Sequence, residues 1–522
     1  MLFFLVFFVI VYVFYQTFIK PAKYWNNKGV EHINLWRRFL SVFLSKKSFL
    51  VLIREAYNFY PNTRYYGSFQ FLKPSLMVTD LELIKKITTK DFDHFHDHPS
   101  ISNKNVDTVL TQNLFSLEGH KWREMRSTLS PAFTSSKMRH MFDLMVQVAQ
   151  NFTNFYIEQY KDSAVLELEM KEACSRYTND VIASCAFGIE VNSLEDRENE
   201  FFRMGNVFAA SFRGRNALRG LILGFFPLLG QILKISIFPQ FVTDFFKKIV
   251  SDTIAFREKN HITRPDMIHL LMQARTGELQ EENTNENAGF ATVEEIEKEK
   301  RFSQKVELAD NVIAAQALAF FFAGFETSAT VLSFISYELA IKPEIQKKLH
   351  QEIDETLLKN SGKLDYEAVL KMKYLDQVIS EVLRLYPPAF AISRVCTKNY
   401  VIDKKLENEE DFLIEKGCIV VVPIFGLHMD PNYFPNPDDF DPERFNEENK
   451  HKIVPGTYMP FGMGPRNCIG SRFALLEIKA LVVSFLSQFS LEPVKKTEIP
   501  ITFSKTAILS TKNGIWIGLK KR

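Results

Sequence analysis

The sequence has few cysteines and little net charge. Its 522 residues contain five dispersed cysteines, with no Cys-x-x-Cys pair. An odd number of widely spaced cysteines in so long a chain indicates neither a disulfide framework nor a zinc site, so at least one thiol is free. The formal net charge is +2, and the chain as a whole therefore shows no sign of nucleic-acid binding.

Long hydrophobic runs are also scarce, and the clearest one is N-terminal. It extends from Leu2 to Ile19 and stops at Lys20, with no positive segment before it and no small-residue cleavage site after it. This pattern favours an uncleaved signal anchor over a secretory signal or an interfacial helix. Basic residues directly after the run favour a cytoplasmic location for the rest of the chain, where thiols stay reduced.

A second apolar stretch, residues 221–241, reads LILGFFPLLGQILKISIFPQF and is interrupted by Pro227, Gly230 and Pro239. These interruptions exclude a membrane-spanning helix. Arginines lie just upstream, at Arg213, Arg215 and Arg219. Two interpretations remain open: a segment that dips into a membrane surface, which would admit lipophilic molecules from the bilayer, or a buried helix–loop–helix.

Most of the chain to about residue 390 reads as helical, and the remainder is richer in Pro, Gly and Asn with short strands. We therefore expect a mainly α fold with a small β-rich subdomain. The proline-free stretch from Arg301 to Leu339 predicts one long helix through the interior. The acidic residues 276–300 indicate a solvated loop or a linker, and Gly417 to Ile424 predicts a core strand that carries Cys418.

The residues around Cys468 carry the strongest chemical signal. The string PFGMGPRNCIG places three glycines close to the cysteine, and a helical pattern follows from Ser471. A thiol just before a helix start meets the positive end of the helix dipole, which favours a thiolate. A merely structural cysteine would not need three glycines. Because no second cysteine or histidine stands at ligand spacing, a cofactor must supply the other metal ligands, and haem meets that requirement.

Together with four further motifs, this string resembles the cytochrome P450 superfamily, in order and across nearly the whole chain. The motifs are Phe461-x-x-Gly464-x-Arg466-x-Cys468-x-Gly470, Trp122-x-x-x-Arg126, Ala323-Gly324-Phe325-Glu326-Thr327, Glu381-x-x-Arg384 and Pro442-Glu443-Arg444-Phe445. The strings YWNNKGV, FDHFHDH and RPDMIHLLMQA are similar to insect microsomal members, especially those of the ninth family. The resemblance implies the cytochrome P450 fold, with residues 1–20 as membrane anchor and 21–522 as one catalytic domain.

The resemblance also implies a haem b site. Cys468 would be the proximal iron ligand, Phe461 would pack beside the sulfur, and Gly464 and Gly470 would let the loop approach the macrocycle. The anionic propionates would be held by guanidinium or indole donors, for which the matching positions are Arg466, Trp122, Arg126 and Arg394.

Glu326 and Thr327 match the acid–alcohol pair with which the family delivers protons during oxygen activation. Without the other motifs, a solvated glutamate and a hydroxyl bonded back to the preceding turn would be the favoured explanation. Family members that isomerise substrates without activating oxygen often lose this threonine, so its presence predicts a monooxygenase. A second pair, Glu381 and Arg384, would be buried with Arg444 and would have a structural role.

Other residues are less specific. His94, His96 and His98 could chelate a metal, but the neighbouring acids and proline favour a surface turn. Substrate contacts are expected, by the family layout, from an apolar set of residues: Phe115, Phe208, Phe212, Phe320, Ala323, the segment Ala389 to Ile392, and Ala507. For the remaining cysteines, Cys174, Cys185, Cys396 and Cys418, we expect packing roles.

Electrons must come from another protein, because no Rossmann glycine fingerprint or flavin module is visible. We expect NADPH–cytochrome P450 reductase, with cytochrome b5 as a further donor, to dock on basic residues near the Trp122 helix: Lys121, Arg123, Lys137 and Arg139. The predicted activity is oxidation of lipophilic small molecules, chiefly xenobiotics, by O₂ at the endoplasmic reticulum membrane. A haem-binding sensor or carrier and an oxygen-independent isomerase are the alternatives.

Overall fold

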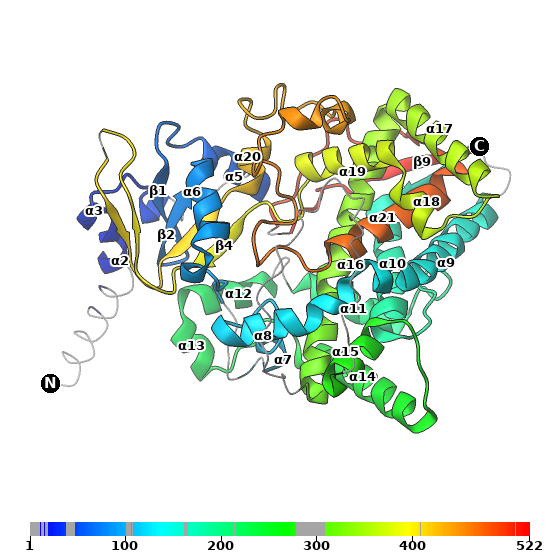
Figure 1. Ribbon diagram of the computed structural model, residues 1–522, viewed down its shortest axis with the longest axis horizontal. Coiled ribbons are helices and arrows are strands. Elements are labelled where there is room, and N and C mark those ends of the chain that lie inside the picture. The colour runs from blue at the N-terminus through cyan, green and yellow to red at the C-terminus, as the bar shows by residue number, and fades with distance from the viewer. Residues whose placement is uncertain are drawn as a thin grey trace.

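The computed structural model describes residues 11, 15, 19–37, 47–100, 106, 108–160, 165–211, 216–277, 308–407, 409–506 and 508–522. Helices pack into a large body, and a smaller part built around a twisted sheet lies at its left in Figure 1. The predicted fold class, mainly α with a small β-rich part, is confirmed. Residues 1–10 and most of 12–18, the expected anchor, lie outside the described residues, as does the acidic stretch 278–300.

Most of the longer helices bury one face against the rest of the protein. Their bounds are α2 Lys20–Ala22, α3 Tyr24–Asn27, α5 Phe49–Tyr57, α6 Leu81–Lys85, α7 Thr108–Thr111, α8 Gly119–Leu129, α9 Ser135–Gln159, α10 Met170–Ile182, α11 Glu200–Ala210, α12 Ala217–Phe225, α13 Pro227–Ile232, α14 Gln240–Asn260, α15 Met267–Thr276, α16 Asp310–Ile341, α17 Pro343–Lys359, α18 Tyr366–Leu370, α19 Lys373–Leu385, α20 Ile424–His428 and α21 Ser471–Leu486.

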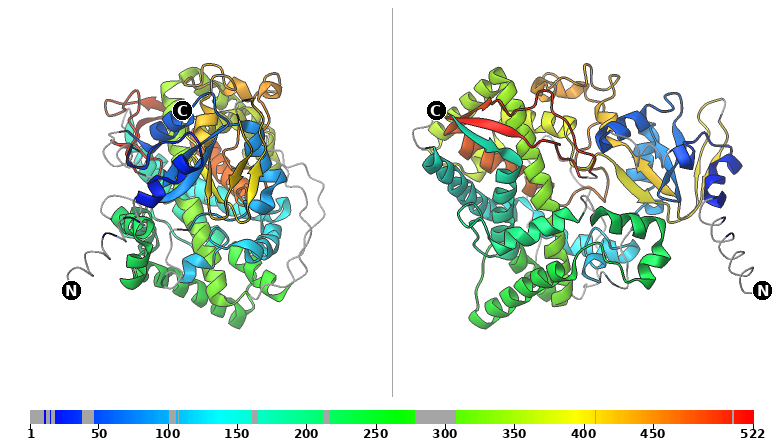
Figure 2. Two further views of the ribbon diagram at one scale, coloured as in Figure 1. Left: turned by 90° about the vertical axis from the view of Figure 1, so that its left-hand side faces the viewer. Right: turned by 180° about the vertical axis from the view of Figure 1, so that it is seen from behind.

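The long helix α16 passes through the helical body (Figures 1 and 2). It is apolar on nearly every side, as expected of a helix surrounded by protein. The prediction that it starts at Arg301 is wrong, because Ala309 is extended and the helix begins at Asp310; Pro343 follows its end. Among the described residues α16 is long and apolar enough to cross a bilayer, but 67% of its apolar window is buried inside the protein.

The strands form three small sheets, with the orders β1-β2-β7-β4, β3-β9-β8 and β5-β6. Their bounds are β1 Tyr65–Gln70, β2 Lys73–Val78, β3 Leu166–Glu169, β4 Ile392–Val395, β5 Tyr400–Ile402, β6 Phe412–Ile414, β7 Ile419–Val422, β8 Phe489–Pro493 and β9 Trp516–Lys521. The expectation that strands gather after residue 390 is incomplete. β2 pairs in parallel with the predicted core strand β7, so the N-terminal hairpin β1–β2 belongs to the same sheet.

The segment 221–241 folds as α12, α13 and the start of α14, with a break at Phe226. Most of α13 faces outward: Leu228 is 73% exposed and Ile232 is 77% exposed, whereas Gly230 is buried. A fully buried helix–loop–helix is therefore wrong for α13. Arg213 and Arg215 lie outside the described residues.

Candidate active site

Cys468 lies in a tight loop that leads into α21. Its backbone N–H donates to the carbonyl of Phe461 at 2.8 Å, and the N–H of Asn467 donates to Gly464 at 2.9 Å. Cys468 is the one exposed cysteine; the other four are buried, as predicted, and burial raises their pKa values. Desolvation also raises the pKa of Cys468, but the Gly470 N–H and the charge of Arg126 oppose that rise.

The glycines of this loop differ in what a side chain would meet at each position. Gly462 and Gly464 both have positive φ, 76° and 74°, where other residues are strained. A Cβ on Gly464 would lie 1.8 Å from the carbonyl oxygen of Thr88. Gly464 therefore permits the close approach of the loop to that backbone, and its expected contact with a macrocycle stays a prediction. A Cβ on Gly470 would make only an ordinary 3.8 Å contact with Phe133.

The middle of α16 has an accessible face inside an otherwise buried helix. Thr327 is the one exposed residue from Phe325 to Ala340, and Ala323, one turn earlier, is exposed as well. The Thr327 hydroxyl donates to the Ala323 carbonyl at 2.5 Å. Phe320 on the same helix packs against Phe133, which in turn lies beside Gly470. Phe133 thus connects α16 to the cysteine loop.

Glu326 is buried and faces α10 instead of solvent. Its carboxylate lies 3.4 Å from Lys171 Nζ, which also donates to the Glu326 carbonyl at 3.1 Å and to Thr330 Oγ1 at 2.9 Å. The side-chain exposure of Lys171 is 20%, so this ammonium connects the buried acid to the surface. The interpretation of Glu326 as a solvated residue is therefore excluded.

Helix α10 holds this turn of α16 at two further points. The Thr178 hydroxyl donates to the Phe325 carbonyl at 2.9 Å. A Cβ on Gly324 would lie 2.7 Å from Ile182 Cδ1, so the glycine permits the close approach of the two helices. Lys171, Thr178 and Ile182 were not among the predicted site residues, since none belongs to a motif.

Two buried arginines stand near the cysteine loop. Arg394 on β4 is 1% exposed; it bonds His98 Nδ1 and the Ser393 carbonyl, and its Nε has no partner among the described residues. Burial lowers its pKa to about 10. Arg466 donates to the carbonyls of residues 96, 114, 115 and 117, and burial together with the charge of Arg394 lowers its pKa to about 9.

The other predicted donors lie around these arginines. Trp122 is buried, and the Arg466 guanidinium stacks over its ring at 4.3 Å. Arg126 donates twice to Asn467, to its carbonyl and its amide oxygen, which fixes the residue next to Cys468. Desolvated guanidinium groups that repel one another are stabilised by an anion. The orphaned Nε of Arg394 therefore fits the carboxylates of a haem.

The histidine cluster is part of this region, and the surface-turn interpretation is wrong for His98. Its ring stacks on Phe115 at 4.5 Å, and its Nδ1 lies 3.2 Å from Arg394 Nη1. Burial and the charges of Arg394 and Arg466 hold the pKa of His98 well below its usual value, so the ring is neutral. His96 bonds Asp97, whose carboxylate also accepts the N–H of Gly119.

The predicted substrate contacts separate into two groups. Phe115 is 64% exposed, and Ala323 and Ala389 are exposed too, although their segments are otherwise packed. Phe208 differs: it is buried and stacks on Phe238 at 3.9 Å, which makes it a packing residue. Phe212 and Ala507 lie outside the described residues.

The structural role predicted for Glu381 and Arg384 is confirmed. Both are fully buried, and Arg384 Nε and Nη2 each donate to the Glu381 carboxylate at 2.7 Å. Arg384 also donates to backbone carbonyls of the segment that precedes the cysteine loop, and Arg444 reaches Glu381 at 3.3 Å.

The basic residues predicted to dock a reductase are not all equally available. Lys121 is exposed, whereas Arg123 forms an ion pair with Asp93. On α9, Arg139 pairs with Glu367 and lies over the Tyr366 ring. These exposed pairs are weak, so they reduce the local positive charge without removing it.

Comparison with known proteins agrees with this geometry. The family model described as Cytochrome P450 matches residues 34–518. The chain is 44% identical to Cytochrome P450 9e2 of Blattella germanica over 92% of this chain and 90% of that protein. It is 39% identical to Probable cytochrome P450 9f2 of Drosophila melanogaster over 100% and 99% of the two chains. The similarity to insect relatives of the ninth family is thereby confirmed, and the chain belongs to the cytochrome P450 family of haem b monooxygenases.

Proposed function

We propose that this protein is a membrane-anchored monooxygenase of the endoplasmic reticulum that oxidises lipophilic small molecules, chiefly xenobiotics. Residues 1–20 would be the anchor, and residues 21–522 a cytoplasmic catalytic domain. NADPH–cytochrome P450 reductase would deliver electrons, with cytochrome b5 as a further donor. One observation carries the proposal: the one accessible thiol, Cys468, stands just before α21 in a loop fixed by Arg126. Of the two buried arginines near this loop, Arg466 has the Asp97 carboxylate at 3.8 Å, whereas Arg394 has no ion-pair partner among the described residues.

Cys468 would bind the haem iron as a thiolate. The bound haem supplies the iron at which O₂ is reduced and its O–O bond cleaved. Three features of the chain favour the thiolate: the N–H of Gly470, the start of α21 and the charge of Arg126. Phe461, whose carbonyl accepts the Cys468 N–H, is half-buried and shields this side of the loop.

Arg394 and Arg466 would hold the two propionates, with Trp122 and Arg126 beside them. The Arg394 guanidinium is already desolvated and has an unused Nε donor, so little reorganisation is needed to accept a carboxylate. The neutral ring of His98 would orient the Arg394 guanidinium and, because it carries no negative charge, would not replace the propionate as its counter-ion. Trp122 would act chiefly by supporting the Arg466 guanidinium from below.

Thr327 and Glu326 would move protons to the oxygen site. Thr327 presents its hydroxyl on the accessible face of α16, and Glu326 lies next to it on the buried face. Lys171 lies 3.4 Å from the Glu326 carboxylate and, being partly exposed, would connect it to protons of the solvent. Lys171 is thus a positioning residue that acts through Glu326.

The substrate would lie against an apolar surface formed by Phe115, Phe320, Ala323 and the segment Ala389 to Ile392. The small side chain of Ala323 leaves room beside Thr327, and the exposed ring of Phe115 supplies contact area. This surface carries few polar groups, which suits a lipophilic molecule and excludes water when occupied.

The thiolate assignment is tested by the spectrum of the reduced, CO-bound protein. The wild type is expected to show the red-shifted Soret band of a thiolate ligand, and Cys468→Ser to lose it. An unshifted band in folded, haem-loaded wild type would overturn the assignment. Reductase-dependent NADPH consumption on addition of a lipophilic substrate separates the monooxygenase from a haem sensor, carrier or isomerase.

The reductase-docking face is tested by charge reversal at Lys121 and Arg123. The affinity for reductase is expected to fall in Lys121→Glu, and more in the double variant, with a weaker salt dependence in both. Lys359→Glu on the exposed end of α17 is the control, since that residue is 75% exposed and outside the proposed face. Unchanged affinity in the double variant would exclude this face.

A further inference from the structure

The surface around α13 is unusually apolar. Large hydrophobic side chains lie exposed on α12, on α13 and at the start of α14: Leu218, Phe226, Leu228, Leu229, Leu233 and Phe241. Patches of this kind mark contacts with membranes or partners. α2, which directly follows the expected anchor, lies at the same end of the molecule as α13 in all three views (Figures 1 and 2). A bilayer that holds the anchor therefore also faces α13.

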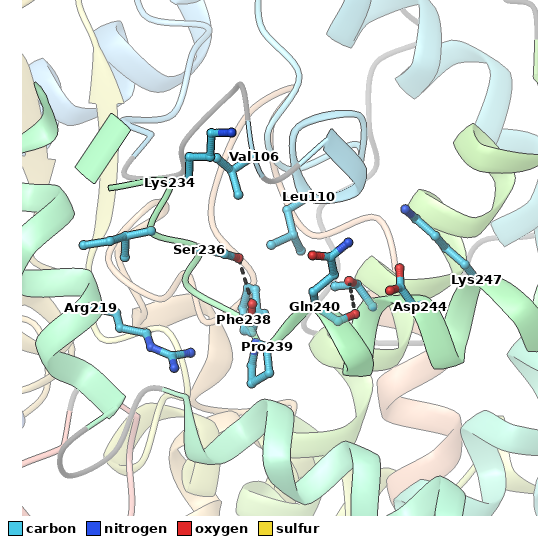
Figure 3. Close-up of a pocket in the computed structure, with 12 residues that line it drawn as sticks. Val106, Leu110, Arg219, Lys234, Ser236, Phe238, Pro239, Gln240, Asp244 and Lys247 are labelled. Atoms are coloured by element: carbon cyan, nitrogen blue, oxygen red, sulfur yellow. Dashed lines mark hydrogen bonds between the residues drawn. The ribbon is translucent and has the colours of Figure 1, made fainter. Parts of the chain in front are cut away.

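A polar cavity of about 520 Å³ adjoins this apolar surface. Figure 3 shows Lys234 and Arg219 on one side of it and Asp244 and Lys247 on the other, with Ser236, Phe238 and Gln240 between them. The lining thus contains three cations and one carboxylate, next to helices whose exposed residues are hydrophobic. This combination of an apolar surface and a cationic cavity matches an amphipathic anion.

Lys234 lines the cavity from a sharp turn between α13 and α14. Lys234 follows the last turn of α13 and has φ 50°, a conformation in which glycine is usual and other residues are strained. The turn is closed by backbone hydrogen bonds from Lys234 to Gln231 and from Ile235 to Gly230. Lys234 lines the cavity opposite Lys247.

We propose that this cavity binds the headgroup of an anionic phospholipid. Lys234, Arg219 and Lys247 would contact the phosphodiester and the negative charge of the headgroup, and Asp244 would accept an ammonium where one is present. The acyl chains would lie over the exposed side chains of α13. This inference rests on the membrane contact proposed above and adds a specific lipid site to it.

The test uses the full-length haem protein in bilayer discs of phosphatidylcholine that contain photoreactive lipids. Photoreactive phosphatidylserine, with its reactive group on the headgroup, is expected to label residues 234–247 more than the matched phosphatidylcholine. Lys234→Gln and Lys247→Gln are each expected to reduce this labelling about fivefold, the loss expected for one cation near a membrane surface. Lys248→Gln is the matched control, because Lys248 is exposed on α14 but does not line the cavity.

The outcomes separate this site from the membrane contact itself. Equal headgroup labelling by the two lipids, or equal labelling of Lys247→Gln and wild type, overturns the lipid site. Lipids with the reactive group on an acyl chain report on α13: labelling of α13 without headgroup preference leaves the membrane contact intact. Absence of labelling on α13 overturns both. Competition by soluble glycerophosphoserine at the same concentration as the lipid would assign the cavity to a free phosphoester instead.

Discussion

Arg384 and Arg394 are both buried cations, and their charges are compensated in different ways. Arg384 has a carboxylate partner, Glu381, and several carbonyl acceptors, so its charge is compensated within the chain. Arg394 is equally buried, but its partners are a neutral histidine and a carbonyl, and burial lowers its pKa. The first site is complete without a ligand, whereas the second would be completed by the proposed haem carboxylate. The presence of a carboxylate partner therefore distinguishes the structural Arg384 from Arg394, for which we propose a binding role. The degree of burial does not distinguish them.

The largest effect is expected for Arg384→Met. It leaves Glu381 buried without its cation and removes the bonds to the segment before the cysteine loop, a loss of about 3–5 kcal/mol. Chemical denaturation of the apoprotein measures it. Arg54→Met is the control: Arg54 bonds Asp438 on the surface, so its loss should cost no more than about 1 kcal/mol. Similar losses in the two variants would contradict the structural role of the buried pair.

A smaller and opposite effect on the apoprotein is expected for Arg394→Met. Removing a desolvated charge that has no carboxylate partner should leave the apoprotein as stable as the wild type, or more stable. Haem should dissociate about 10–100-fold faster, as for other losses in the shell around a metal group. Transfer of haem to an excess of a second haem-binding protein measures the rate. An apoprotein destabilised as much as Arg384→Met would remove the distinction between the sites.

The motif residues could be found in the sequence because each lies in a short, ordered string. The motifs identified the cysteine loop, with Arg466 and Cys468, and the pair of Glu381 and Arg384. Apolar patterning predicted the long helix α16 and the core strand β7. The start of α16 could not be predicted, because apolar patterning says little about where an extended residue such as Ala309 interrupts it.

Residues whose roles depend on contacts with distant parts of the chain could not be recognised from the neighbouring sequence. His98 meets Arg394 across 296 positions, and Lys171 meets the Glu326 carbonyl across 155. The pairing of β2 with β7 is of the same kind, because the two strands lie far apart in the sequence and neither one identifies its partner. Gly464 belongs to a motif, yet its neighbour, the Thr88 carbonyl, lies on a distant helical turn. In each case the residue type was visible and its partner was not.

Glu477 on α21 provides the test with the smallest expected effect, because it is a buried ionisable group with neither an ion-pair partner among the described residues nor a proposed ligand. It is fully buried, neither carboxylate oxygen has a hydrogen-bond partner among the described residues, and the nearby Ser328 hydroxyl lowers its pKa only in part. Burial raises its pKa to about 8. Unlike an arginine, a carboxyl group can neutralise itself by binding a proton, so Glu477 needs no anion or cation to complete it.

The sign of the resulting pH dependence follows from the raised pKa. Below the ordinary pKa of a glutamate, the folded and unfolded chains both hold the proton, so the group costs no stability. As the pH rises toward 8, the unfolded chain loses its proton freely, whereas the folded chain must either retain the proton or bury a charge, and the folded state is destabilised. The wild type should therefore lose about 2 kcal/mol between pH 6 and pH 8 relative to Glu477→Gln. Denaturation of both proteins at the two pH values measures this difference. A constant difference would mean that Glu477 is charged in the folded protein, and that a carboxylate, like Arg394, can stay ionised and buried here without a compensating group.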